Sequence, residues 1–112
     1  KRTIFSERVD GEMQLRRGFE IKPGEKILII EDVLSTGGSI KEVSGLINRH
    51  KGNIVGIGII VDRSITPVHL HDNFFAITKQ TAKIFDKNNI PDYIKDIPAI
   101  KPGSNIVASD TV

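Results

Sequence analysis

The sequence has no cysteine and no tryptophan, and it has only one methionine and one tyrosine among 112 residues. Without cysteine the chain can form neither a disulfide nor a thiolate zinc site, which is compatible with a cytoplasmic location. The five phenylalanines and Tyr93 do not follow the pattern of aromatic side chains that stack on nucleic-acid bases. The apolar stretches around 27–30 and 54–61 are far too short to span a bilayer. We therefore expect a cytoplasmic protein that binds neither membrane nor nucleic acid.

The distribution of charge narrows the possible partners further. Basic and acidic residues are mixed along the chain, with a formal net charge of +2 and no block of one sign. A nucleic-acid surface would need a basic stripe, whereas one or two well-placed arginines suffice to bind a small anionic substrate. With 38% hydrophobic and 27% charged residues, the composition is that of a soluble globular protein.

The length of 112 residues suffices for one compact domain, which we predict to span residues 1–112. The sequence begins with Lys1 rather than Met, and the apolar pair Ile4-Phe5 near its start resembles the end of a strand. We therefore expect the chain to begin inside a domain, with a processed or trimmed start as the alternative.

The hydrophobic pattern predicts an α/β protein. Residues 26–31 and 53–62 are apolar runs typical of strands that are buried on both faces of a parallel sheet. Between them, residues 38–50 carry an apolar stripe at helical spacing, and Gly52 is expected to end that helix. This order of strand, helix and strand indicates a βαβ unit. The predicted stripe consists of Ile40, Val43, Leu46, Ile47 and His50.

The remaining segments carry weaker signals. Gly56 and Gly58 fall on one face of their strand, so we expect a close contact there. The tetrapeptide IKPG occurs at 21–24 and 100–103 and predicts a turn at each place, as does Asp86-Lys87-Asn88-Asn89. We further predict strands at 3–5, 13–21 and 74–78, a loop at 6–12 that turns at Asp10-Gly11, a short helix within 79–90, and an irregular tail over 91–112.

The stretch ILIIEDVLSTGGSIKE, residues 27–42, carries the functional signal. Its apolar strand is followed by two acids, Glu31 and Asp32, and then by a small hydroxylic turn with two glycines. Ligands of open α/β sheets bind beyond the carboxyl ends of the strands. Carboxylates there can accept hydrogen bonds from sugar hydroxyls, and the N–H groups of a glycine-rich turn before a helix can bind phosphate. The pattern predicts a sugar phosphate ligand; the alternative is a helix cap, Ser35 or Ser39, after two solvated acids.

The same stretch resembles the phosphoribosyl-pyrophosphate signature of the type I phosphoribosyltransferases: an apolar strand, two acids, two apolar residues and a small hydroxylic turn. The flanking stretches FSERVDGEMQLRRGF, IIVDRS and IPAIKPGS resemble the orotate phosphoribosyltransferases of that family. The resemblance covers most of this chain, but only about the C-terminal half of the family's fold. It implies the family's Rossmann-like parallel-sheet fold without its N-terminal part.

The resemblance also implies roles for individual residues. Glu31 and Asp32 would bind the ribose hydroxyls of phosphoribosyl pyrophosphate and take part in catalysis, and Arg63 would bind the orotate carboxylate. Ser35 would lie close to both the phosphate and the base. Mg²⁺ would accompany the pyrophosphate, with no protein side chain binding it directly. The donor-binding residues implied by the match are Glu31, Asp32, Val33, Leu34, Ser35, Thr36, Gly37, Gly38 and Ser39.

Two of the implied cationic sites have plainer alternatives. The family has a mobile basic loop that closes over the active site of the neighbouring subunit of a homodimer, and residues 7–17 occupy its place. This segment has no internal lysine, so Arg8 is our catalytic candidate, while Arg16 and Arg17 equally suit an exposed strand edge. For Arg63 the alternative is a surface ion pair with Asp62 or with a helix acid.

The implied reaction transfers the phosphoribosyl group from phosphoribosyl pyrophosphate to orotate, giving orotidine 5′-phosphate and pyrophosphate in pyrimidine biosynthesis. The family's pyrophosphate-binding loop is not found in this sequence. Two alternatives therefore stay open. One is an inactive fragment that serves as a phosphoribosyl-binding or dimerisation module, and the other is a phosphoribosyltransferase for another base, or a regulator built on the same fold.

A second motif, His69-Leu70-His71-Asp72, has the HxH spacing found in zinc sites. Structural zinc is almost always held by four ligands and catalytic zinc by three, and no third ligand is apparent here. We predict a polar loop after Pro67 rather than a metal site.

Overall fold

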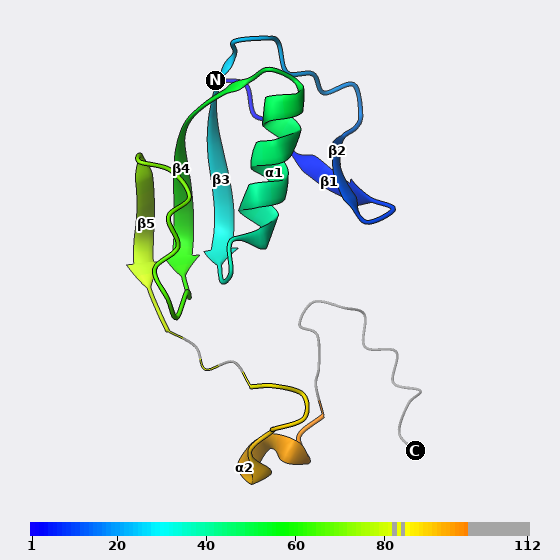
Figure 1. Cartoon of the computed structure of the whole chain (residues 1–112). Coiled ribbons are helices and arrows are strands. Elements are labelled where there is room, and N and C mark those ends of the chain that lie inside the picture. Colours follow the sequence, from blue (N-terminus) through cyan, green and yellow to red (C-terminus); the bar gives the residue numbers. More distant parts are fainter. Residues whose placement is uncertain (82, 84, 99–112) are drawn as a thin grey trace.

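The computed structural model describes residues 1–81, 83 and 85–98. Its main body is a three-stranded parallel sheet with a helix on one face (Figure 1). The sheet order β3-β4-β5 follows the chain, and helix α1 connects β3 to β4. The predicted α/β class and strand–helix–strand unit are thus confirmed. The elements are β3 (Lys26–Leu34), α1 (Gly38–Arg49), β4 (Asn53–Asp62) and β5 (Phe74–Lys79).

The N-terminal segment forms an antiparallel hairpin of β1 (Ser6–Val9) and β2 (Glu12–Leu15), which lies beside α1 (Figure 1). The predicted strand at 3–5 is wrong, and so is the loop at 6–12. Only Asp10 and Gly11 form the turn, with φ of 48° and 86°, which suits the Asp-Gly pair of a tight hairpin. Most of the segment 7–17 is therefore hairpin.

Strand β2 ends at Leu15 and does not reach residue 21 as predicted. The physical reason is the backbone that follows. Arg17 and Gly18 both have positive φ, 58° and 73°, which a continuing strand does not allow. The two arginines thus lie beyond the strand rather than on its edge.

The C-terminal part differs from the prediction as well. Within 79–90, the residues that the structure describes contain no helix, and Asn89 instead closes the predicted turn by donating its N–H to the Asp86 carbonyl at 2.9 Å. A short helix, α2 (Asp92–Lys95), lies inside the tail that was predicted to be irregular. Pro91 immediately precedes it, because proline is compatible with the start of a helix but not with its interior. The turn predicted at 100–103 lies outside the described residues.

The core lies between α1 and one face of the sheet. Its members are isoleucine and leucine side chains that alternate along the strands and recur along the helix. His50 does not extend the stripe as predicted, because it is the exposed C-cap residue of α1. The buried cluster consists of Ile21, Ile29, Leu34, Ile40, Ile47, Ile57 and Ile59.

The opposite face of the sheet is apolar but exposed, so the prediction of burial on both faces is wrong. Ile30 is 66% exposed, and Phe75 is 67% exposed. Within the described residues, α1 is the helix that packs on this sheet, and it covers only one side (Figure 1). The predicted close contact at the two glycines does occur on this open face. A Cβ on Gly58 would lie 3.0 Å from Ile30, and one on Gly56 would lie 3.2 Å from the Asn73 carbonyl oxygen.

Gly52 does not end α1 in the way the sequence suggests. The left-handed residue at the helix end is Lys51, with φ of 58°. The N–H of Gly52 bonds to the carbonyl of Ile47 at 3.0 Å, and that of Lys51 bonds to Asn48 at 2.9 Å, which is the Schellman pattern. Gly52 is small for packing, since a Cβ there would lie 2.8 Å from both Ile27 and Ile47.

Candidate functional site

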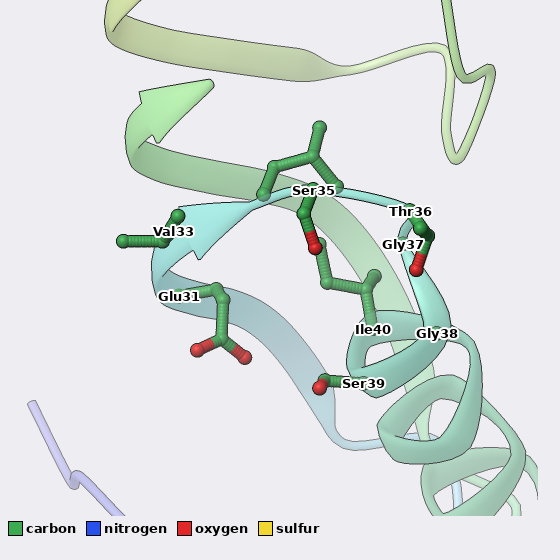
Figure 2. A pocket seen from close by; sticks show the side chains of 9 residues that line it. Glu31, Val33, Ser35, Thr36, Gly37, Gly38, Ser39 and Ile40 are labelled. Atoms are coloured by element: carbon green, nitrogen blue, oxygen red, sulfur yellow. The ribbon is translucent and has the colours of Figure 1, made fainter. Parts of the chain in front are cut away.

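A pocket lies where β3 passes into α1. It is lined by Glu31 and by the residues of the turn and the first helical positions, nearly all from one continuous stretch of sequence. In Figure 2 the Glu31 carboxylate and the Ser35 and Ser39 hydroxyls surround one hollow between β3 and the first turn of α1. The structure thus brings together eight of the nine predicted donor-binding residues. The lining consists of Glu31, Val33, Leu34, Ser35, Thr36, Gly37, Gly38, Ser39 and Ile40.

The turn leads into α1 without a side-chain cap. The N-cap residue is Gly37, in the left-handed region with φ of 81°, and no side chain bonds to the first N–H groups of the helix. The alternative in which Ser35 or Ser39 serves as the cap is therefore wrong. Helix N-terminal N–H groups that lack an internal partner carry partial positive charge and favour an anion. This end of α1 opens onto the pocket.

Gly37 also lies close to two side chains of another segment. A Cβ at this position would lie 3.1 Å from Leu70 Cδ2 and 3.3 Å from Val68 Cγ1, both in the segment between β4 and β5. That segment therefore supports the turn from outside the motif. Sequence reasoning did not identify this support, because Val68 and Leu70 belong to a polar-looking loop.

The two adjacent acids face different surroundings. Glu31 is partly buried and lines the pocket, whereas Asp32 is exposed and does not. Burial, followed by hydrogen bonding and charge repulsion from Asp32, raises the pKa of Glu31 above that of an ordinary glutamate. Asp32 accepts a hydrogen bond from the Val33 N–H at 2.7 Å. Both acids lie within β3, which runs to Leu34.

Arg63 follows β4 at the same edge of the sheet as the pocket, although it is not part of the lining. Its side chain is exposed, and its N–H donates to the Leu34 carbonyl at 2.7 Å. The suggested ion pair with Asp62 does not form; Oδ1 of Asp62 instead accepts both the N–H and the hydroxyl of Ser64. No ion pair of Arg63 with a helix acid occurs in the described part of the chain either.

Arg8 points toward α1 and does not line the pocket. Its guanidinium lies 2.7 Å from the Glu42 carboxylate and donates to the Gly11 carbonyl at 2.8 Å. Arg17 forms a separate ion pair with Glu7 at 2.9 Å. In this arrangement the hairpin cations are engaged with acids of the hairpin and of α1 rather than with the pocket.

The HxH segment forms the predicted loop. His69 lies 3.3 Å from Asp72, and Nδ1 of His71 accepts the Asn73 N–H at 2.9 Å. Across the residues that the structure covers, no three metal-ligating His, Cys, Asp or Glu side chains lie together. In the same described part, neither helix is long and apolar enough to span a membrane.

The chain is similar to proteins of a known family. The family model of the phosphoribosyl transferase domain matches residues 2–93. The orotate phosphoribosyltransferase of Thermoanaerobacter sp. (strain X514) is 47% identical over 103 residues, covering 92% of this chain and 54% of that protein. The orotate phosphoribosyltransferase of Thermotoga maritima is 45% identical over 103 residues, covering 92% of this chain and 55% of that protein. The chain thus spans about half the length of the curated relatives it matches.

A solved structure was also compared with this chain. The crystal structure of adenine phosphoribosyltransferase from Thermoanaerobacter pseudethanolicus is 14% identical in sequence and aligns with a TM-score of 0.48. The alignment covers 70% of this chain and 48% of that chain.

Proposed function

The chain belongs to the phosphoribosyl transferase domain family, and on that premise we propose that its protein transfers a phosphoribosyl group from phosphoribosyl pyrophosphate to orotate. The observation that carries the proposal is the pocket at the β3–α1 junction. It combines a partly buried carboxylate, Glu31, with a hydroxylic glycine turn before an uncapped helix. A ribose needs acceptors for its hydroxyls and its 5-phosphate needs donors, and the pocket offers both.

The donor would lie with its 5-phosphate in the turn 35–39 and its ribose toward β3. The turn offers hydroxyls and backbone N–H groups for the phosphate oxygens. Glu31 would accept a ribose hydroxyl from inside the pocket. For Asp32 we keep the predicted role at the ribose. Its carboxylate would reach a ribose hydroxyl from outside the residues that line the pocket.

The reaction would be a displacement at the anomeric carbon. The C–O bond to pyrophosphate breaks and its electron pair leaves with pyrophosphate, while the orotate ring nitrogen forms the new C–N bond and gives up its proton to the departing pyrophosphate or to water. Positive charge develops on the ribose as in other glycosyl transfers. A carboxylate fixed beside the ribose stabilises that charge. Glu31, which lines the pocket, would supply that carboxylate. The displacement itself would need no nucleophilic side chain.

Mg²⁺ is the cofactor that we propose for the departing pyrophosphate. Mg²⁺ is usually bound by substrate phosphates, waters and one or two carboxylates rather than by a protein cage. As the resemblance implies, the pyrophosphate and waters would hold the ion and no protein side chain would bind it directly, which leaves Glu31 for the ribose. When bound, Mg²⁺ would neutralise charge on the leaving group.

Orotate would be bound through its carboxylate by Arg63. The planar guanidinium can donate two parallel hydrogen bonds to a carboxylate. Support comes from its position at the pocket edge and from its exposed side chain, which carries no ion pair in the described structure. Arg8 remains our candidate for a loop cation, and to reach the pyrophosphate it would have to leave Glu42. We also propose a cytoplasmic homodimer.

The test is pyrophosphate release that depends on orotate, phosphoribosyl pyrophosphate and Mg²⁺, measured with this chain and with the longest product of its gene in parallel. Absence of turnover in the longest product would overturn the proposal. Adenine and uracil in place of orotate test for another base. Binding of ribose 5-phosphate without turnover in either protein would instead favour the alternative of a phosphoribosyl-binding module.

Asp32→Asn tests the acid pair directly. We expect a weaker affinity for phosphoribosyl pyrophosphate or a lower turnover in any active form, since the amide keeps one acceptor but lacks the charge. Asp72→Asn is the matched control, because the Asp72 side chain is 95% exposed and lies outside the pocket. Equal kinetics for Asp32→Asn and the control would remove the role assigned to Asp32.

A further inference from the structure

Asp62, the last residue of β4, is a buried acid to which the proposed chemistry assigns no role. It is 9% exposed, and its neighbour Ser64 is 3% exposed. A buried carboxylate is costly unless its oxygens accept hydrogen bonds. Here Oδ1 of Asp62 accepts the N–H of Ser64 at 2.8 Å and its hydroxyl at 2.6 Å. The two bonds close a three-residue turn with Arg63 in the middle.

The backbone of this turn joins the ends of all three parallel strands. The N–H of Arg63 donates to the carbonyl of Leu34 at 2.7 Å, and Leu34 is both the last residue of β3 and part of the pocket lining. On the other side, the N–H of Gln80, just after β5, donates to the carbonyl of Asp62 at 2.8 Å. The backbone on both sides of Arg63 is therefore fixed, while its side chain stays exposed at the pocket edge.

We propose that Asp62 is a positioning residue, which holds Arg63 at the angle from which its guanidinium meets the carboxylate of the acceptor base. The inference rests on the proposed function, because it names what directs the acceptor-binding arginine of that site. Bidentate binding of a carboxylate depends on the direction of the guanidinium plane. Because an arginine side chain is flexible, a fixed backbone reduces the conformational freedom that the residue loses on binding. The hydrogen bonds from the Ser64 side chain and backbone also lower the pKa of Asp62, so its carboxylate stays an acceptor at neutral pH.

Three variants separate positioning from general support of the fold. Asp62→Ala removes both bonds, Asp62→Asn keeps an oxygen that can accept them, and Ser64→Ala removes only the hydroxyl bond. The matched control is Asp86→Ala. Asp86 accepts the Asn88 N–H at 2.8 Å in the same kind of turn, but it is exposed and does not line the pocket.

The readouts are kcat and the separate KM values for orotate and phosphoribosyl pyrophosphate in the longest active product of the gene. We expect Asp62→Ala to raise the KM for orotate by roughly 10- to 100-fold, as is typical when a hydrogen bond to a charged group is lost. The KM for phosphoribosyl pyrophosphate should change by less than about twofold, since the turn residues that bind it are unchanged. Asp62→Asn should restore most of the orotate affinity, and Asp86→Ala should match the wild type.

The effect of Asp62 must also disappear when Arg63 is absent. The double variant Asp62→Ala with Arg63→Ala should raise the KM for orotate no further than Arg63→Ala alone, because residues that act as a unit are not additive. Full additivity, an equal rise of both KM values, or a wild-type KM for orotate in Asp62→Ala would each overturn the inference. If Asp62→Ala does not fold, Ser64→Ala provides the test instead. We expect it to raise the KM for orotate by a smaller factor and to leave the KM for phosphoribosyl pyrophosphate unchanged.

A second measurement keeps this inference separate from the proposed function. If the wild type shows no turnover, the proposed function fails, and the positioning claim is then judged by amide hydrogen exchange. The N–H of Arg63 should exchange at least about tenfold faster in Asp62→Ala than in the wild type or Asp62→Asn, because its bond to Leu34 opens more often. Equal exchange in the three proteins would show that Asp62 does not fix this turn.

Discussion

Two neighbouring glycines of the pocket turn should respond in opposite ways to alanine. Gly37 has φ of 81°, and an L-residue in the left-handed region is disfavoured by about 1–2 kcal/mol. Its new Cβ would also lie 3.1 Å from Leu70 and 3.3 Å from Val68, so both side chains would have to move by a few tenths of an ångström. Overpacking of this kind adds about 1 kcal/mol at the low end of its usual range. Gly37→Ala should therefore lower the free energy of unfolding by about 2–3 kcal/mol.

Gly38 is the next residue, but it is the first of α1 and has no positive φ. The nearest neighbour of a Cβ there is the Thr36 hydroxyl at 3.7 Å, an ordinary contact distance. Alanine is favoured over glycine in helices by up to about 1 kcal/mol, and by less in the first turn. Gly38→Ala should therefore leave the free energy of unfolding unchanged or raise it slightly.

The assay is equilibrium urea unfolding of the wild type and both variants, followed by far-ultraviolet circular dichroism. The two variants should differ by about 2–4 kcal/mol in unfolding free energy, well above the uncertainty of linear extrapolation. Calorimetry with ribose 5-phosphate should in addition show a loss of affinity of about tenfold or more for Gly37→Ala, because the N–H groups that we propose to bind the phosphate shift with the turn. A Gly37→Ala variant as stable as Gly38→Ala would refute the strain argument.

Three further predictions concern Glu31 and the end of α1. Because the pKa of Glu31 is raised in the folded chain, the folded state holds its proton to higher pH than the unfolded state, and stability falls as pH rises from the unfolded pKa through the raised one. Glu31→Gln should thus be more stable than the wild type at neutral pH and equally stable at acid pH, and it should bind ribose 5-phosphate more weakly. Thermal melts of both proteins across pH test the stability prediction, and a difference in melting temperature that does not change with pH would contradict it. At the helix end, Gly52→Ala should lose about 1–3 kcal/mol by overpacking against Ile27 and Ile47. Lys51→Gly should raise the free energy of unfolding by up to about 1 kcal/mol, because it relieves a positive φ. Urea unfolding measures this gain, and its absence would mean that Lys51 is not the left-handed residue.

The elements that the sequence predicted well are those with a long signal, either a continuous apolar run or an apolar stripe at helical spacing. The strand at 53–62 matches β4, and the helix at 38–50 differs from α1 by one residue at its end. The pocket was predictable for a related reason. All of its lining residues fall within 31–40, so a local motif already contains them in order. A site assembled from one continuous stretch needs little knowledge of how distant segments pack.

What could not be predicted depends on partners far along the chain. An apolar strand does not reveal whether another element covers its second face. The exposure of Ile30 and Phe75 could therefore not be predicted from the sequence. Similarly, Ile4-Phe5 resembled a strand end, but the Phe5 ring packs edge-on against Phe19 at a centroid distance of 5.0 Å. The turn at Asp62 was visible only as an Asp-x-Ser spacing, which is common in loops. Its bond to Leu34 joins two strand ends and required the sheet register.

The adjacent acids illustrate how one boundary changes an interpretation of function. If β3 ended before Glu31 and Asp32, a bend could have turned both carboxylates toward one ribose. β3 instead continues to Leu34 and contains both acids; Glu31 lines the pocket, whereas Asp32 is exposed and is not part of the lining. We therefore expect the two acids to contribute differently to binding of a ribose phosphate. Glu31→Gln should reduce affinity for ribose 5-phosphate more than Asp32→Asn does, and equal losses would mean that the strand opens at this point when the ligand binds.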